Sequence, residues 1–215
     1  AEVMSDDKSG QTDSRELSKL IVNEAAEMTR MVDDLLTAAR IDSTGVEIDL
    51  QPTRLADVVE SAVAPFEKAG VAVQRISSQV VAETDAARLR HILVNLLSNA
   101  VRHGGQTIGV SISAGDRNAD IEVWDDGPGV PDEHVEKLFD RFIHNGSTPL
   151  LTGSVGLGLA VASSLATKLG GRLSYQRFNT KSYFIVSLPL AEAEIPTPEP
   201  RERRALATLV KALTS

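Results

Sequence analysis

The chain has 215 residues and a formal net charge of −8, from 30 acidic and 22 basic side chains, and it contains no cysteine. This acidic balance argues against nucleic-acid binding through a general basic surface, and the missing thiols exclude disulfides and thiolate metal sites. No run of about 18 apolar residues is present, so we expect no membrane-spanning segment. Position 1 is Ala and no signal pattern follows, so we interpret the chain as part of a longer product.

The first expected element is a long helix from Ser14 to Arg40, a stretch without Pro or Gly, in a region that we place at residues 1–44. Its apolar residues recur in steps of four and three, which is typical of a coiled-coil seam. They are Ile21, Ala25, Met28, Val32, Leu35 and Ala39. The helix could lie on its own domain or pair with other helices. Its place ahead of the globular part favours pairing.

Residues 45–191 form the second region, in which helical and strand periodicities are mixed. We expect helices at 55–68, 86–103 and 155–169, the last one ended by Gly170-Gly171. Alternating apolar residues predict strands around 71–76, 108–112, 121–123 and 184–188. Short turns such as Gly115-Asp116 favour antiparallel pairing. The pattern predicts an α+β fold, a two-layer sandwich of a mixed β-sheet covered by helices and preceded by one long helix.

The third region, residues 192–215, contains the sequence PTPEP and then a basic and apolar helix candidate at 201–213. We interpret it as a linker and an appended short helix.

Polar residues with possible chemistry share one stripe of the 86–103 helix. Asn95 and Asn99 are one turn apart, Arg102 follows on the same stripe, and His103 lies beside it. Asn is an unfavourable residue inside a helix, because its side chain competes for backbone hydrogen bonds. The stripe is either a solvated face or a carboxamide pair that offers oxygen ligands to Mg²⁺, with Arg102 near a phosphate.

The sequence WDDGPGV (124–130) follows an expected strand directly. Asp-Gly-Pro-Gly forms a turn in many proteins. The functional alternative is that Asp125 accepts a hydrogen bond from the exocyclic amine of adenine, because an ionised carboxylate is only an acceptor. Gly127 and Gly129 would let a ligand approach the backbone.

Residues 142–167 contain no Lys, Arg, Asp or Glu. Pro149 and several glycines would interrupt a spanning helix, so a membrane segment is excluded. Gly153, Gly156 and Gly158 open the 155–169 helix, where exposed backbone N–H groups and the helix dipole favour an anion.

Four segments together resemble the N, G1, F and G2 boxes of sensor histidine kinases: NLLSNAVRHGG (95–105), WDDGPGV (124–130), LFDRF (138–142) and GSVGLGL (153–159). The catalytic domain of that family shares its ATP-binding fold with gyrase, heat-shock chaperone ATPases and mismatch-repair ATPases. The segment EAAEMTRMVDDLLTAARID (24–42) is similar to the second helix of the family's dimerisation hairpin.

The resemblance implies ATP and Mg²⁺ as ligands. Asn99 with Asn95 would hold Mg²⁺, Arg102 would contact phosphate, His103 would replace an aromatic residue near the base, and Asp125 would read adenine. The loop 143–153 would be the ATP lid. The implied nucleotide-binding residues are Asn95, Asn99, Arg102, His103, Asp125, Gly127, Gly129, Val130, Phe142, Gly153, Gly156, Leu157, Gly158 and Leu159.

The resemblance also implies partners. The γ-phosphoryl group would pass to a histidine and then to an aspartate on the receiver domain of a response regulator. The N-terminal helix would form a homodimer, and the chain would be a cytoplasmic domain of a membrane-anchored receptor.

The sequence departs from the family pattern in three ways. None of the four histidines, at positions 91, 103, 134 and 144, has the context of the acceptor box, which we expect upstream of Ala1. The lid lacks the usual basic residue, with His144 where an Arg is common and Arg141 the nearest cation. Asn95 stands where ATPase relatives carry a Glu general base, which favours kinase over ATPase activity.

Three alternatives remain. The chain could be a degenerate nucleotide-binding module that serves docking, which the uncharged lid favours. It could be an ATP-driven clamp of the gyrase type, which Asn95 disfavours. A serine kinase of the anti-sigma type is disfavoured by the N-terminal helix.

Overall fold

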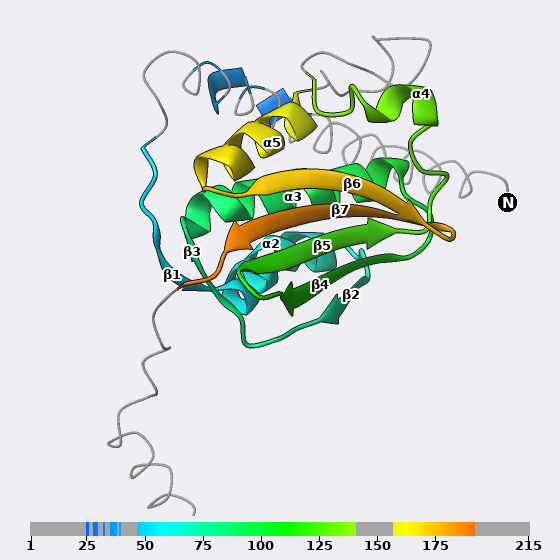
Figure 1. The fold of residues 1–215 in the computed structure, drawn as a ribbon. Helices are drawn as coiled ribbons and strands as arrows, with labels where there is room; N and C mark the ends of the chain where they lie inside the picture. The colour runs from blue at the N-terminus through cyan, green and yellow to red at the C-terminus, as the bar shows by residue number, and fades with distance from the viewer. Residues whose placement is uncertain are drawn as a thin grey trace, which may run out of the picture.

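The computed structural model describes residues 47–140 and 157–191, together with helical positions 25, 28, 29, 32, 35–37 and 39. Two layers make up the described part of the chain, with one sheet on one side and the longer helices behind it (Figure 1). None of the described helices is long and apolar enough to cross a membrane. The segment 192–215 and most of 1–44 lie outside the described residues, so these domain limits stay predictions.

The main sheet has five strands in the order β2-β4-β5-β7-β6. β2 pairs with β4 in parallel, and the other neighbours are antiparallel. The predicted mixed sheet and α+β class are therefore confirmed, as is the antiparallel hairpin at Gly115-Asp116. The strands are β2 (Val73–Ile76), β4 (Ile108–Ala114), β5 (Asn118–Asp125), β6 (Arg172–Phe178) and β7 (Lys181–Pro189).

Two further strands, β1 (Gln51–Arg54) and β3 (Val81–Thr84), form a small antiparallel sheet. An isolated bridge between Ala82 and Leu190 links this sheet to the chain just after β7. The sequence analysis did not predict β1, β3, β6 or the short helix α4 (Asp132–Val135).

Helices α2 (Leu55–Lys68) and α3 (Ala86–His103) have the predicted limits. Asp85 begins α3, because its carboxylate accepts hydrogen bonds from the backbone N–H groups of Ala87 and Arg88 at 2.9 and 3.1 Å. Pro65 cannot donate to the carbonyl of Ser61, and Arg90 of α3 donates to that carbonyl at 3.3 Å instead. The Ser61 carbonyl, which lacks its usual partner within α2, thereby forms a hydrogen bond that connects the two helices.

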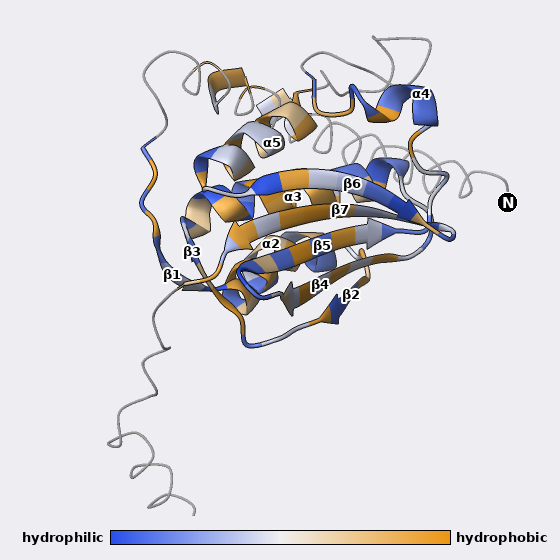
Figure 2. Ribbon diagram, viewed as in Figure 1, coloured by the Kyte–Doolittle hydropathy of each residue, from blue (hydrophilic) through white to orange (hydrophobic). Residues whose placement is uncertain are grey.

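The apolar core lies between the helices and the sheet. Every predicted core residue of α3 is buried, and each aliphatic side chain contributes roughly 1.5–3 kcal/mol by leaving water. Hydrophobic and hydrophilic bands alternate along β5, so that one face of the strand packs on the helices (Figure 2). The predicted core residues of α3 are Leu89, Ile92, Leu93, Leu96, Leu97 and Ala100.

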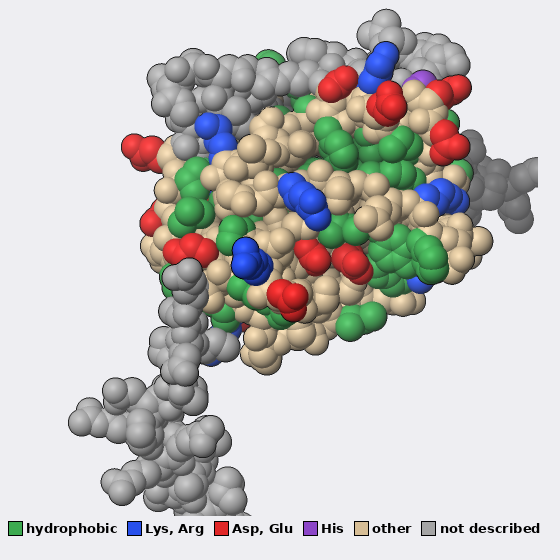
Figure 3. Space-filling model, in the orientation of Figure 1, with side chains coloured by type: hydrophobic (Ala, Val, Ile, Leu, Met, Phe, Trp, Pro, Cys, Tyr) green, Lys and Arg blue, Asp and Glu red, His purple; other side chains and the backbone are tan. Residues whose placement is uncertain are grey.

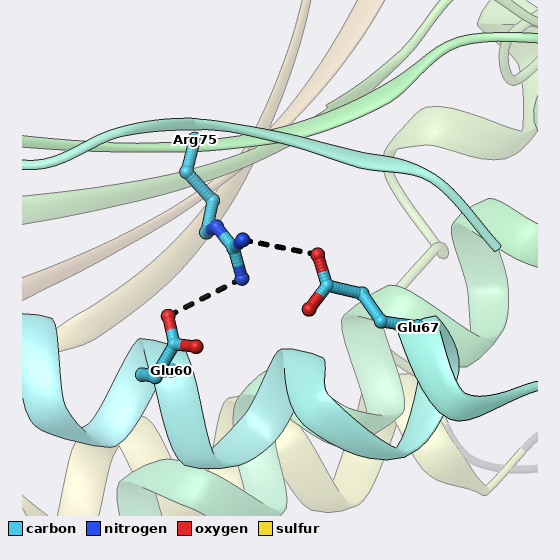
Figure 4. A network of polar contacts seen from close by, with 3 residues as sticks. All are labelled: Glu60, Glu67 and Arg75. Atoms are coloured by element: carbon cyan, nitrogen blue, oxygen red, sulfur yellow. Dashed lines mark hydrogen bonds and ion pairs between the residues drawn. The ribbon is translucent and has the colours of Figure 1, made fainter. Parts of the chain in front are cut away.

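The edge strand β2 is joined to α2 by an ion-pair network. Arg75 contacts Glu60 at 3.2 Å and Glu67 at 3.0 Å, two carboxylates that lie two turns apart on the helix (Figure 4). All three side chains are at least one third exposed, so each pair contributes less than about 1 kcal/mol. The side of the sheet away from the helices carries charged and hydrophobic side chains in small separate groups (Figure 3).

The predicted helix at 155–169 is observed as α5 (Gly158–Lys168), and positions 155 and 156 lie outside the described residues. Its predicted apolar register is confirmed, since Leu157, Val161, Leu165 and Leu169 are all buried. Gly170, at φ +76°, follows the helix in the left-handed conformation that favours glycine.

Candidate nucleotide-binding site

Three chain segments converge at the C-terminal ends of α3 and β5 and the start of α5. Helix α3 packs on both α5 and β5. The helix ends at His103, and Gly104 donates to the carbonyl of Ala100 at 2.8 Å. A Cβ at Gly104 would lie 2.9 Å from Cβ of Asp125, so only glycine lets the chain pass this close to the end of β5.

Asp125 is the buried acidic group of this site. It ends β5 with 5% of its surface exposed, and its Oδ1 accepts a hydrogen bond from the backbone N–H of Gly127 at 2.9 Å. Burial raises the pKa of the Asp125 carboxyl, with a smaller contribution from Asp126. The Gly127 N–H, Arg177 and His103 oppose this rise in pKa.

His103 lies within electrostatic reach of Asp125. Burial and the positive charge of Arg102 lower the pKa of His103, and Asp125 opposes that change. His103 is therefore predominantly neutral at pH 7, and its imidazole offers a flat, mostly apolar surface beside the carboxylate. The structure thus brings the predicted residues His103 and Asp125 into one neighbourhood.

The turn after β5 is held by the chain that follows α3. Asp126 accepts a hydrogen bond from the backbone N–H of Thr107 at 2.8 Å and donates its own N–H to the carbonyl of Thr107 at 3.2 Å. The hydrogen bonds from Thr107 lower the pKa of Asp126. This second carboxylate is consequently an anchor for the turn.

Gly127 and Gly129 contact protein atoms where the sequence analysis expected an approaching ligand. A Cβ at Gly127 would lie 2.7 Å from the backbone of Gly104, and a Cβ at Gly129 would overlap the guanidinium of Arg177. Gly129 also has φ +78°, a conformation that other residues rarely adopt. Close packing inside the protein is sufficient reason for glycine at both positions.

Asn95 joins α3 to the start of α5. Its Nδ2 donates to the carbonyl of Gly158 at 3.3 Å, and Asn95 and Asn99 are both half-buried. The structure therefore brings Asn95 close to Gly158. Leu157 is buried, and Leu159 packs against the core. Arg102 is exposed at the end of α3. Phe142, Gly153, Gly156 and the predicted lid lie outside the described residues.

Strand β6 supplies two contacts that the sequence analysis missed. The hydroxyl of Tyr175 accepts a hydrogen bond from the N–H of Val130 at 3.0 Å, and Arg177 donates to the carbonyl of Gly127 at 3.2 Å. Both side chains come from β6, which follows the site in sequence by about 45 residues. No motif marks them, because the groups that they bind are backbone atoms.

A sequence model of one family, described as histidine kinase-, DNA gyrase B-, and HSP90-like ATPase, matches residues 84–192. The chain belongs to this family of ATPases. The match begins at the last residue of β3 and ends just after β7, so it includes every described site residue. The resemblance to sensor histidine kinases is confirmed by relatives that carry this name.

The sensor protein CseC of Streptomyces coelicolor is 36% identical over 159 residues, which cover 74% of this chain and 30% of CseC. The chain thus spans about a third of the length of that relative. The sensor histidine kinase TrcS of Mycobacterium tuberculosis is 33% identical over 188 residues, which cover 82% of this chain and 37% of TrcS.

The fold is shared with solved histidine kinases. The histidine kinase AdeS of Acinetobacter baumannii superimposes with a TM-score of 0.66 at 23% identity, covering 82% of this chain and 85% of that one. The predicted fold class is therefore confirmed.

Proposed function

We propose that this chain is the ATP-binding catalytic portion of a sensor histidine kinase. It transfers the γ-phosphoryl group of Mg-ATP to a histidine that lies outside the chain. One observation carries the proposal: a buried carboxylate, Asp125, is oriented by Gly127 at the point where the end of α3 meets the end of β5. A buried acceptor beside a flat neutral imidazole suits the amine edge of adenine.

Each described site residue has a distinct role in this proposal. Asp125 accepts the adenine amine, and His103 packs beside the base. Arg102, exposed at the end of α3, contacts a phosphate oxygen. Gly158 and Leu159 present backbone N–H groups at the start of α5, where the helix dipole favours the negative triphosphate.

The donor set fits a magnesium ion that is shared with the nucleotide. Among the described residues there is no group of three or more acidic, His or Cys side chains that could hold a metal ion. Mg²⁺ usually keeps water molecules and substrate phosphate oxygens as ligands, so one or two amide oxygens from α3 are a sufficient protein contribution. Asn99 would ligate through its amide oxygen, and Asn95 through Oδ1, since its Nδ2 donates to Gly158. When bound, the ion would neutralise charge on the phosphates.

In the transfer, a nitrogen of the acceptor imidazole attacks the γ-phosphorus. The new P–N bond forms as the bond between that phosphorus and the bridging oxygen breaks, and ADP leaves. The chain contributes positioning and charge neutralisation, with no covalent step on its own residues. Asn95 cannot act as a general base for water, so we expect ATP hydrolysis to be slow.

The proposal extends to partners. The phosphoryl group would pass on to a receiver-domain aspartate, and the N-terminal helix would pair in a homodimer. The described seam residues Met28, Val32 and Leu35 are 59%, 55% and 54% exposed. Exposed apolar side chains favour a helix that binds another helix over one that packs on its own domain. We also propose that the parent protein is anchored in a membrane with this domain in the cytoplasm.

A phosphotransfer assay in trans tests the activity. The chain would be mixed with γ-labelled ATP, Mg²⁺ and a helical hairpin from a relative that carries the acceptor histidine. We expect acid-labile label on the hairpin and little free phosphate. Rapid release of phosphate without labelled hairpin would contradict the kinase function and favour an ATPase.

A degenerate docking module remains the second candidate, and the uncharged stretch from 142 to 167 is the observation that favours it. Absence of both ATP binding and phosphotransfer would make this candidate the leading one.

A further inference from the structure

Three side chains from β6 and β7 hold the turn that carries the adenine-reading groups. They are Tyr175, Arg177 and Ser182, and we name them the β6–β7 bracket. Arg177 donates through Nη2 to the carbonyl of Gly127 at 3.2 Å. Tyr175 accepts from the N–H of Val130 at 3.0 Å. The bracket therefore binds the turn at two backbone groups, three residues apart.

Ser182 joins the two other members of the bracket. Its Oγ accepts hydrogen bonds from Nη1 of Arg177 at 3.0 Å and from the hydroxyl of Tyr175 at 3.4 Å. Ser182 is 2% exposed and is the paired residue of Asp125 on β5 and of Arg177 on β6. Asp125, Ser182 and Arg177 thus form one row across three neighbouring strands. A buried hydroxyl with two hydrogen-bond donors resists movement, because breaking either bond would cost free energy.

We propose that Arg177 is a positioning residue for nucleotide binding, which fixes the Gly127–Val130 turn and places its charge near Asp125. This inference rests on the proposed function of Asp125. Arg177 acts on the site through Gly127 and through its charge, without a need to touch the nucleotide. Gly129 packs against the same guanidinium, so the exposed arginine lies directly beside the turn.

The charge of Arg177 matters because it opposes the rise in the pKa of Asp125 that burial causes. Burial and Asp126 raise the pKa of Asp125, whereas Gly127, Arg177 and His103 lower it. His103 faces Asp125 from α3, and Arg102 further disfavours a positive charge on His103. Among the charged side chains that act on Asp125, Arg177 lowers the pKa of its carboxyl most. Lys181 lies over the Trp124 ring, and Trp124 points to the other face of the sheet from Asp125.

Two substitutions separate the geometric role from the electrostatic one. Arg177→Met keeps the aliphatic stem and removes both the hydrogen bonds and the charge. Arg177→Lys keeps the charge but lacks the planar fork that binds Gly127 and Ser182 together. Arg172→Gln is the matched control, because Arg172 is an exposed arginine of the same strand that faces away from the turn.

The measurement is the dissociation constant of Mg-ATP between pH 5 and pH 8, by calorimetry, with thermal melting to check folding. The ratio of the variant constant to the wild-type constant cancels the titration of the nucleotide itself. We expect Arg177→Met to weaken binding by about tenfold at pH 8, the loss expected for a charge-assisted hydrogen bond, and by more at pH 5. Arg177→Lys should weaken binding by about threefold with the same ratio at every pH. The Arg172→Gln control should bind like the wild type.

A purely structural arginine would give a ratio independent of pH in Arg177→Met. That result would overturn the electrostatic part of the proposal, and wild-type affinity in Arg177→Met would overturn all of it. Tyr175→Phe gives a second test if Arg177→Met does not fold: loss of the Val130 bond should weaken binding by about three- to tenfold. If the wild-type chain does not bind Mg-ATP, the proposed function itself is contradicted. If the wild type binds and the variants bind equally well, only the role of Arg177 is contradicted.

Discussion

The two ends of the candidate site are built differently. At the proposed adenine end, the turn after β5 is held by three parts of the chain: Thr107 from the α3–β4 connection, Gly104, and the β6–β7 bracket. At the proposed phosphate end, the described residues include Asn95, which donates a hydrogen bond to Gly158, and the start of α5. In the proposed function, the adenine end is prearranged, whereas the phosphate end would offer amides and a helix terminus and would leave much of the charge neutralisation to Mg²⁺.

This contrast predicts that changes at the adenine end act on affinity without regard to the metal, and that changes at the phosphate end act on the metal dependence. The substitutions below use that difference, starting with the largest expected effect.

Asp125→Asn should have the largest effect on nucleotide binding. The amide keeps the Gly127 hydrogen bond through its oxygen but can place a donor where the adenine amine needs an acceptor. We expect ATP affinity to fall by roughly 10- to 100-fold, corresponding to about 1.5–3 kcal/mol for a hydrogen bond with a charged group. Calorimetry measures this loss, with Asp116→Asn in the exposed β4–β5 turn as the matched control.

The same Asp125→Asn protein should be at least as stable as the wild type without nucleotide. Because burial raises the pKa of Asp125 in the folded state, its ionisation opposes folding as pH rises through the interval between the unfolded and the folded pKa. Removing the charge removes this opposition at neutral pH. A lower melting temperature than that of Asp116→Asn would show that Asp125 stabilises the fold and would argue against a binding role.

Gly129→Ala should lower both stability and affinity. The residue has φ +78°, which costs roughly 1–2 kcal/mol for a side chain, and the new Cβ would displace the Arg177 guanidinium. We expect about tenfold weaker ATP binding and a lower melting temperature. Gly115→Ala is the control, since a Cβ there would lie 3.6 Å from its nearest neighbour. Equal behaviour of the two variants would contradict the importance of the Gly129 conformation.

Asn99→Ala should mainly reduce the dependence of ATP binding on Mg²⁺. We expect the gain in ATP affinity on adding Mg²⁺, about tenfold or less for one amide ligand, to disappear, while metal-free binding stays unchanged. Titrations with and without Mg²⁺ measure it. Asn95→Ala is the informative comparison, because it also breaks the contact with Gly158. An unchanged magnesium response in Asn99→Ala would place the metal ligand elsewhere.

The pH dependence of binding should be the mildest effect. Protonation of Asp125 would remove its charge and add an O–H donor where the adenine amine needs an acceptor. Burial raises the pKa of Asp125, so affinity should fall as pH falls through that pKa. His103 has a lowered pKa and stays neutral until more acidic conditions than usual. The ratio of the ATP affinity of the wild type to that of Asp125→Asn, followed between pH 5 and pH 8, measures the contribution of Asp125 ionisation to binding. A ratio that does not decrease at low pH would contradict ionisation of Asp125 as the requirement.

The sequence predicted elements with their own continuous apolar face better than elements that depend on a distant partner. Long periodic segments such as α2 and α3 were predicted to the residue, because each buries a continuous apolar face and is bounded by clear signals. Strand β1 contains Pro52 and has no buried residue, so it is a strand only because β3 pairs with it. β6 buries only Leu173, which left its alternation weak.

The residues of the candidate site likewise fall into those that the sequence could indicate and those that it could not. Asp125, Asn95 and Asn99 could be named as candidates from the sequence, since the proposed chemistry needs their side-chain groups. Arg177 and Tyr175 could not be named, because they bind backbone groups about 45 to 50 residues away, and no residue pattern encodes that contact. The reason for Gly104 likewise became visible only once β5 lay against it.

The most direct test of the account is a calorimetric titration of the wild-type chain with ATP and with GTP, each with and without Mg²⁺. The account predicts ATP binding that strengthens with Mg²⁺, and GTP binding at least about tenfold weaker, because a carboxylate repels the carbonyl oxygen of guanine. No ATP binding at millimolar concentration, or equal affinity for ATP and GTP, would contradict the central claim that Asp125 reads adenine.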